Sequence, residues 1–145
     1  MMFTRLIGAC LAISGVLGIL LVSMNLYAAD APAESNDTIF ELRTYTTQEG
    51  KLPALETRFR DHTMSLFEKH GFTNVGYWIP VDKPNTLIYI ISHPNRDAIA
   101  TGWKAFGADP AWQKVAKESQ LDGPILIKGG ITSQFMTASD FSPIQ

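Results

Sequence analysis

The chain has 145 residues, a formal net charge of −2 and a single cysteine. This length favours one domain, and a surface without a basic excess lacks the charge needed to hold a phosphate backbone. Nucleic acid is therefore excluded as a predicted partner. The only cysteine, Cys10, lies in the apolar N-terminal segment, so a chain without that segment has no thiol ligand, thiolate nucleophile or disulfide.

The N-terminal segment is typical of a secretory signal, because Arg5 precedes an uncharged apolar run over residues 6–24 and small residues follow that run. We predict a signal peptide over residues 1–28 and an exported protein, periplasmic or secreted. The uncharged run is nearly long enough to cross a bilayer, so the alternative is a membrane anchor through residues 6–24 if the leader is not cleaved. Residues 29–38 are predicted to form a flexible linker.

The remaining residues, 39–143, predict one domain with the order strand, helix, strand, strand, helix, strand. This order favours an α+β fold, a ferredoxin-like βαββαβ sandwich with helices on one face of an antiparallel sheet. The predicted elements are a strand over 39–47, a helix over 52–69, strands over 73–80 and 86–93, a helix capped by Asn95, a short helix begun by Asp109 and Pro110, and a strand within 125–136.

The strand over 86–93 is apolar on both faces. Leu87, Tyr89 and Ile91 alternate with Ile88 and Ile90, so neither face is suited to water. Helices can cover only one face of the sheet, and a second copy of the chain is the simplest cover for the other. The sequence therefore predicts a homodimer built sheet to sheet.

The first strand alternates apolar and polar side chains. Phe40 and Leu42 suit the face that helices cover, which assigns Glu41, Arg43 and Tyr45 to the opposite face. Buried charges need partners or water. The polar set therefore predicts either an ion-pair network across the dimer, with Glu41 in a structural role, or the wall of a wet cavity.

Two histidines lie eight residues apart on the predicted helix. Their separation of about 12 Å along the helix axis is too large for one zinc ion, so no metal site is predicted. His62, between Phe59 and Leu66, is expected on the buried stripe, where it either bonds a strand or exchanges protons at a cleft, which makes it the one weak catalytic candidate. His70 is expected to complement the helix dipole as a structural residue.

No cofactor is predicted, because the sequence has no phosphate-binding glycine loop, dinucleotide fingerprint or serine–histidine–acid order. Trp78 is a candidate cavity residue, and the other tryptophans are expected in the core. The sequence thus suggests a small-molecule site in which Arg43 pairs an anion, Tyr45 and Trp78 stack on the ligand, and His62 lies nearby.

Two segments resemble the NIPSNAP family, namely "FELRTYTTQEGKLPALETRFRDHTMSLFEKHGFTNVGYW" and "AFGADPAWQKVAKES". The resemblance extends over residues 39–142 and implies the fold and dimeric assembly of the dimeric α/β-barrel superfamily. Animal members are mitochondrial and associated with vesicle traffic and mitophagy signalling, whereas the leader of this chain departs from them. The positions that match the family motifs are Glu41, Arg43, Tyr45, His62, His70, Gly71 and Trp78.

Three functions remain open at this point. The first is an exported homodimer that binds a small apolar or aromatic molecule with one anionic group. The second is an enzyme like the cofactor-independent monooxygenases of structurally related superfamilies, with His62 as general base. The third is a structural or protein-interaction module in which the polar face of the first strand only locks the dimer.

Overall fold

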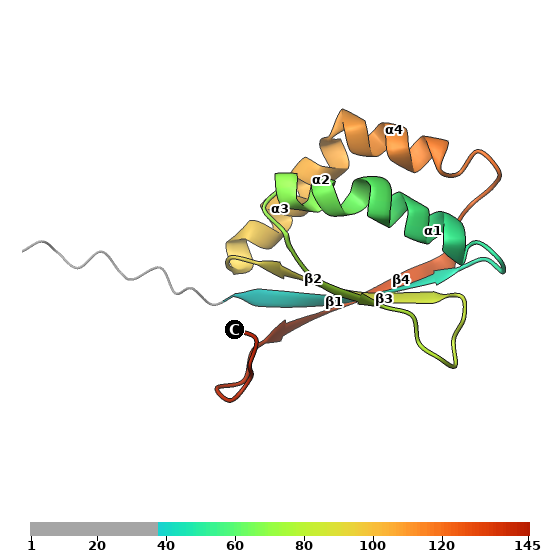
Figure 1. The fold of residues 1–145 in the computed structure, drawn as a ribbon. Helices are drawn as coiled ribbons and strands as arrows, with labels where there is room; N and C mark the ends of the chain where they lie inside the picture. The colour runs from blue at the N-terminus through green and yellow to red at the C-terminus, as the bar shows by residue number, and fades with distance from the viewer. Residues whose placement is uncertain (1–37) are drawn as a thin grey trace, which may run out of the picture. The chain divides into compact units, whose positions relative to one another are not determined.

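The computed structural model describes residues 38–145. The predicted signal peptide, and all but the last residue of the predicted linker, lie outside these residues. A four-stranded antiparallel sheet with the order β2-β3-β1-β4 carries helices on one face (Figure 1). The elements are β1 (Ile39–Thr47), α1 (Leu52–Arg58), η1 (Phe59–Thr63), α2 (Met64–Lys69), β2 (Thr73–Trp78), β3 (Thr86–His93), α3 (Arg96–Ala108), α4 (Pro110–Glu118) and β4 (Leu126–Thr137).

The element order and the strand order confirm the predicted ferredoxin-like α+β sandwich. The predicted caps are confirmed as well. The Asn95 side chain accepts a hydrogen bond from the Ala98 amide at the start of α3, and Asp109 accepts one from the Ala111 amide at the start of α4. Within residues 38–145, no helix is both long enough and apolar enough to cross a bilayer.

The first helical run contains a π-helical turn, η1, between α1 and α2. The Met64 amide donates to the Phe59 carbonyl, five residues back, where an α-helix would use a spacing of four. This wider turn brings Thr63, rather than His62, onto the buried face. The expectation that His62 lies on the buried stripe is therefore wrong, and its ring is exposed on the outer side of the helix.

The two faces of β1 are the reverse of those predicted. Glu41, Arg43 and Tyr45 point toward the helices, as their hydrogen bonds and ring contacts with helical residues show. Strand alternation then places Phe40 and Leu42 on the open face of the sheet. The prediction was wrong because it assumed that charged side chains of β1 point away from the core. In the structure the buried charge has several partners within the same chain.

The core between sheet and helices is built from aromatic side chains. Tyr89 lies at its centre and is fully buried, with the rings of Tyr45, Phe59, Phe67 and Tyr77 at centroid distances of 5.0 to 6.1 Å. Such edge-to-face and stacked contacts add to the stability that burial alone provides. The helix-covered face of the sheet is thus filled by rings.

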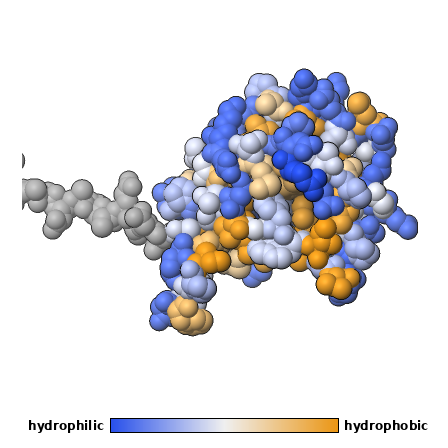
Figure 2. All heavy atoms as spheres, viewed as in Figure 1, coloured by the Kyte–Doolittle hydropathy of each residue, from blue (hydrophilic) through white to orange (hydrophobic). Residues whose placement is uncertain are grey.

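The opposite face of the sheet has no helix over it (Figure 1). It contains a shallow hollow of about 290 Å³, and Figure 2 shows hydrophobic residues at the surface beside the sheet. Trp78 lies on this face with 52% of its surface exposed. The residues that line the hollow are Phe40, Val75, Ile90, Met136, Thr137, Ala138, Ser139, Ser142 and Ile144.

Candidate functional site

Glu41 lies at the centre of a buried polar network under α3. Its carboxylate accepts hydrogen bonds from the Arg43 guanidinium and from Trp103 Nε1 at 2.9 Å, and it contacts His93 Nε2 at 2.9 Å. Burial raises the pKa of Glu41, but the hydrogen bonds with His93 and Trp103 and the charge of Arg43 outweigh burial and hold it below its usual value. The carboxylate is therefore ionised and paired.

The charge of Arg43 is balanced by this network. Its guanidinium carbon lies 4.4 Å from the centroid of the Trp103 ring, and its Nη2 atom donates to the Tyr45 hydroxyl at 3.4 Å. Burial lowers the pKa of Arg43, whereas Tyr45, Tyr89 and Glu41 together raise it above its usual value. Arg43 is thus a cation whose charge Glu41 already compensates.

A small cavity lies between the sheet and the helices. Its volume is about 200 Å³, and five aromatic rings contribute to its wall. Its lining residues are Tyr45, Arg58, Phe59, Thr63, Phe67, Phe106, Trp112, Ala116, Gln120, Leu126 and Ile131. This combination of rings with a few polar groups is the usual composition of a site for a small organic molecule.

Arg58 is the charged residue of this cavity. It is 6% exposed, although it lies at the end of α1 on a helix surface where arginines usually extend into water. Its Nη1 atom lies 3.4 Å from Ser119 Oγ, and its guanidinium carbon lies 5.5 Å from the Trp112 ring centroid. Within residues 38–145, no carboxylate lies within ion-pair distance of Arg58, and its buried Nε–H has no acceptor.

The surroundings of Arg58 disfavour its charge. Burial lowers the pKa of Arg58 below its usual value, and the nearby Tyr45 and Tyr89 offset only part of that effect. A guanidinium remains charged at neutral pH nonetheless. The chain thus holds a buried positive charge whose counter-ion is absent from the described residues.

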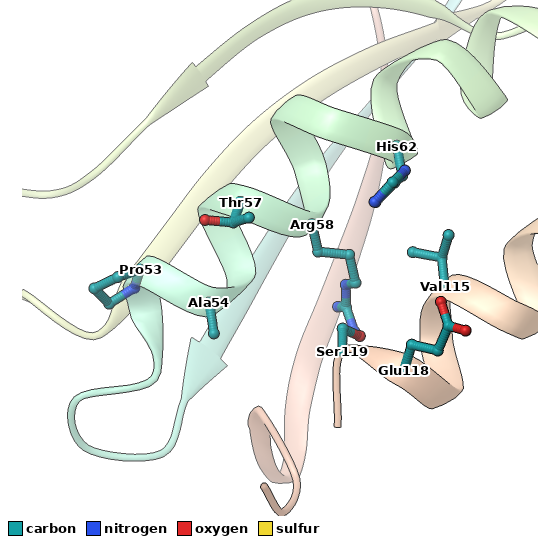
Figure 3. Close-up of a pocket in the computed structure, with 8 residues that line it drawn as sticks. All are labelled: Pro53, Ala54, Thr57, Arg58, His62, Val115, Glu118 and Ser119. Carbon is teal, nitrogen blue, oxygen red and sulfur yellow. The ribbon is translucent and has the colours of Figure 1, made fainter. Parts of the chain in front are cut away.

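A second hollow, the α1–α4 groove, lies on the outer side of the helices. Its volume is about 410 Å³, and Figure 3 shows Arg58, His62 and Glu118 around it. Arg58 is the one residue that lines both this groove and the inner cavity. The residues that line the groove are Pro53, Ala54, Thr57, Arg58, His62, Val115, Glu118 and Ser119.

The structure does not bring the four predicted ligand residues together. Arg43 and Tyr45 lie under the helices, but only Tyr45 lines the inner cavity. His62 is on the outer groove, and Trp78 is on the open face of the sheet, packed over Gly76 so closely that a Cβ atom there would contact the indole. The predicted single site is thus divided among three surfaces.

His70 contacts an acid rather than acting on the helix dipole alone. Its Nε2 atom lies 2.8 Å from Asp109 Oδ2, which also accepts from Lys69 Nζ at 2.7 Å. These contacts join the end of α2 to the start of α4, which is a structural role. Within residues 38–145, no three histidine, cysteine or acidic side chains gather where they could hold a metal ion.

Arg58 is the residue that the sequence analysis missed. Leu52, Leu55 and Phe59 form the start of the buried stripe of the first helix, and Arg58 is three residues after Leu55 on the same stripe. A cation within an apolar stripe is a feature of the sequence that indicates a candidate site, because such a position is buried and a buried charge needs a partner.

The family model for NIPSNAP matches residues 40–143. The chain belongs to the NIPSNAP family. This match covers most of the 145 residues and includes the inner cavity and the α1–α4 groove. No match was found among curated proteins.

Solved structures show the same fold. A NIPSNAP family protein from Agrobacterium tumefaciens is 22% identical, with 77% of this chain and 96% of that chain covered and a TM-score of 0.65. A NIPSNAP-like domain protein from Burkholderia xenovorans is 16% identical, with coverage of 74% and 90% and a TM-score of 0.64. At these identities the likeness shows the fold alone.

A weaker likeness relates the chain to SnoaB, a cofactor-independent oxygenase from Streptomyces nogalater. The two are 17% identical, with 74% of this chain and 97% of that chain covered and a TM-score of 0.48. A similarity of this size carries no conclusion about activity.

Proposed function

We propose that this NIPSNAP domain is exported, forms a homodimer, and binds a small apolar or aromatic molecule with one anionic group in the cavity beneath its helices. The observation that carries the proposal is Arg58, a buried cation without a carboxylate partner in the described chain, placed beside an aromatic cavity.

The energetic reason is the high cost of a buried, uncompensated charge. Moving an ion out of water costs several kcal/mol, and a counter-ion with well-placed hydrogen bonds recovers much of that cost. A carboxylate on the ligand would accept from the guanidinium of Arg58, including the Nε–H that has no other acceptor. The rings of Phe59, Phe106 and Trp112 would contact the apolar part of the ligand.

This site replaces the one proposed from the sequence. The charge of Arg43 is compensated by Glu41, and Arg43 does not line the cavity. We therefore assign the anion-binding role to Arg58. Tyr45 keeps a place in the cavity wall, whereas His62 and Trp78 do not lie in this cavity.

The geometry supports binding in preference to acid–base catalysis within the cavity. None of the residues that line it in the described structure is a histidine, an aspartate or a glutamate. His62, the residue considered as a general base, lies on the outer groove instead. A general base must be within hydrogen-bond reach of the proton that it removes, and His62 has no place in the cavity wall.

The open face of the sheet supports a homodimer. Ile90, Met136 and Trp78 place apolar surface on a face that the helices leave uncovered. Two copies packed sheet to sheet would remove this surface from water and leave the helices of each copy outside. Export rests on the order of charged, apolar and small residues in the leader.

Native mass spectrometry of the protein purified from its own cell envelope tests all three parts. We expect a dimer without residues 1–28 that releases a small organic anion under harsher activation. Arg58→Met should yield an empty dimer, whereas Arg60→Met, a matched change at an exposed residue of the same helical run, should retain the ligand. A wild-type dimer that is empty and does not bind added 3-phenylpropanoate would contradict the binding function and support a structural module.

A further inference from the structure

Arg58 is shared by the linings of two hollows of the domain. Its side chain lines both the inner cavity of about 200 Å³ and the α1–α4 groove of about 410 Å³. A cavity of ~150 Å³ is enough for benzene, whereas whole ligands usually occupy ~300–1,000 Å³. The inner cavity is thus large enough for a ring, and the groove offers room for the remainder of a ligand.

The groove carries charges of both signs. Arg58 and His62 approach it from the first helical run, and Glu118 approaches it from α4 (Figure 3). The Glu118 side chain is 58% exposed, and its one ion pair in the described chain is with Lys114 at 4.0 Å, the outer limit for such a contact. A head group with negative charge alone would gain from Arg58 but be repelled by Glu118.

We propose that the ligand is an aromatic α-amino acid or a close analogue that keeps both the carboxylate and the neighbouring ammonium group. The ring occupies the inner cavity, the carboxylate pairs with Arg58, and the ammonium lies in the groove toward Glu118. This inference rests on the proposed binding function and adds the chemical class of the ligand. Ser119, whose hydroxyl lies beside Arg58, is placed to accept a further hydrogen bond from the ammonium.

The test uses two probes that differ by one ammonium group, L-phenylalanine and 3-phenylpropanoate. Dissociation constants are measured at pH 7 by NMR titration of the protein as its host produces it. We expect the wild type to bind phenylalanine about two- to fivefold more tightly, as befits a partly exposed ion pair. Glu118→Gln should abolish this preference without weakening the binding of 3-phenylpropanoate.

Two further variants separate the possible failures. Arg58→Met should weaken both probes about tenfold or more, because both use the carboxylate. Glu49→Gln removes the same charge from an exposed turn that does not line the groove, and it should keep the preference.

Two results would overturn this inference while the proposed binding function stands: equal binding of the two probes by the wild type, or a preference for phenylalanine that survives Glu118→Gln. Failure of both probes to bind the wild type would instead overturn the proposed function itself. The outcomes therefore distinguish a wrong ligand class from a wrong binding function.

Discussion

Arg43 and Arg58 are both arginines of the region between sheet and helices, but their surroundings differ. Arg43 forms an ion pair with Glu41 and lies over the Trp103 ring. Arg58 has a hydroxyl at 3.4 Å and a ring at 5.5 Å, and no carboxylate within ion-pair distance in residues 38–145. The first charge is compensated within the chain, and the second is not.

This difference separates a structural charge from one available to a ligand. A buried ion pair with several hydrogen bonds fixes the positions of its members, and removing one member leaves the other unpaired at a large cost. A buried cation without a counter-ion is costly in the free protein, and that cost is reduced when an anion binds. The contrast predicts opposite responses when the two arginines are changed.

The largest effect is expected from Glu41→Gln. This change removes the charge that compensates Arg43 and weakens the hydrogen bonds from Trp103 and His93. The free energy of unfolding should fall by about 3–5 kcal/mol in a denaturant titration. Glu49→Gln, at an exposed turn position, should change it by less than about 0.5 kcal/mol. A loss of the same size in both variants would contradict a structural role for the network.

Replacing each arginine by methionine tests the contrast itself. Arg43→Met should destabilise the unliganded protein by about 3–5 kcal/mol, because Glu41 is left buried and unpaired. Arg58→Met removes an uncompensated charge and should leave stability unchanged or raise it by about 1 kcal/mol. Equal destabilisation by the two changes would mean that Arg58 has a counter-ion after all.

The assembly can be separated from the network. Ile90→Asp places a carboxylate in the hollow of the open face and should convert the proposed dimer to a monomer by light scattering, with association weakened on the order of a hundredfold. Ala100→Asp, at an exposed position of α3, should remain dimeric. Because the Glu41 network lies within one chain, Glu41→Gln should still destabilise the monomeric variant. A network that bridged two copies would give no such loss.

Acid should weaken the protein partly through Glu41. The pKa of Glu41 is lowered from 4.5 by its hydrogen bonds and by Arg43, although burial acts in the opposite direction. A lowered pKa gives stability that is complete above the unfolded value and lost as pH falls through the folded value. The free energy of unfolding should therefore decline below about pH 4.5, with a smaller slope in Glu41→Gln. An unchanged slope in that variant would assign the decline to other groups.

One such group is Asp109. Hydrogen bonds from Lys69, His70 and the Ala111 amide hold its pKa below the usual value. The stability that Asp109 contributes is therefore also lost as the pH falls. Asp109→Asn isolates its contribution, since this residue joins α2 to α4 and is separate from the Glu41 network.

The sequence predicted much of the architecture because its local signals agree with the fold. The apolar run of β3, the cap at Asn95 and the Asp109–Pro110 start of α4 all act over a few residues. The faces of β1 could not be assigned in this way, because what stabilises Glu41 comes from His93 and Trp103, more than 50 residues away. Polarity alone then points to the wrong face.

The site was predicted less well than the fold for three physical reasons. The π-helical turn shifts the helical phase, so His62 becomes exposed where an ideal α-helix would bury it. The position of Arg58 on the apolar stripe indicates its burial, but the absence of a carboxylate around it in residues 38–145 depends on tertiary contacts that no sequence pattern reports. Trp78 was placed near Arg43 and Tyr45, but these two residues point toward the helices whereas Trp78 lies on the open face.

The most direct measurement is the thermal unfolding of the wild type and of Arg58→Met with and without 3-phenylpropanoate. We expect the ligand to raise the melting temperature of the wild type and to raise that of the variant much less, although the unliganded variant is at least as stable. Arg60→Met should respond as the wild type does. An equal rise in wild type and Arg58→Met would contradict the claim that Arg58 is the cation that holds the ligand.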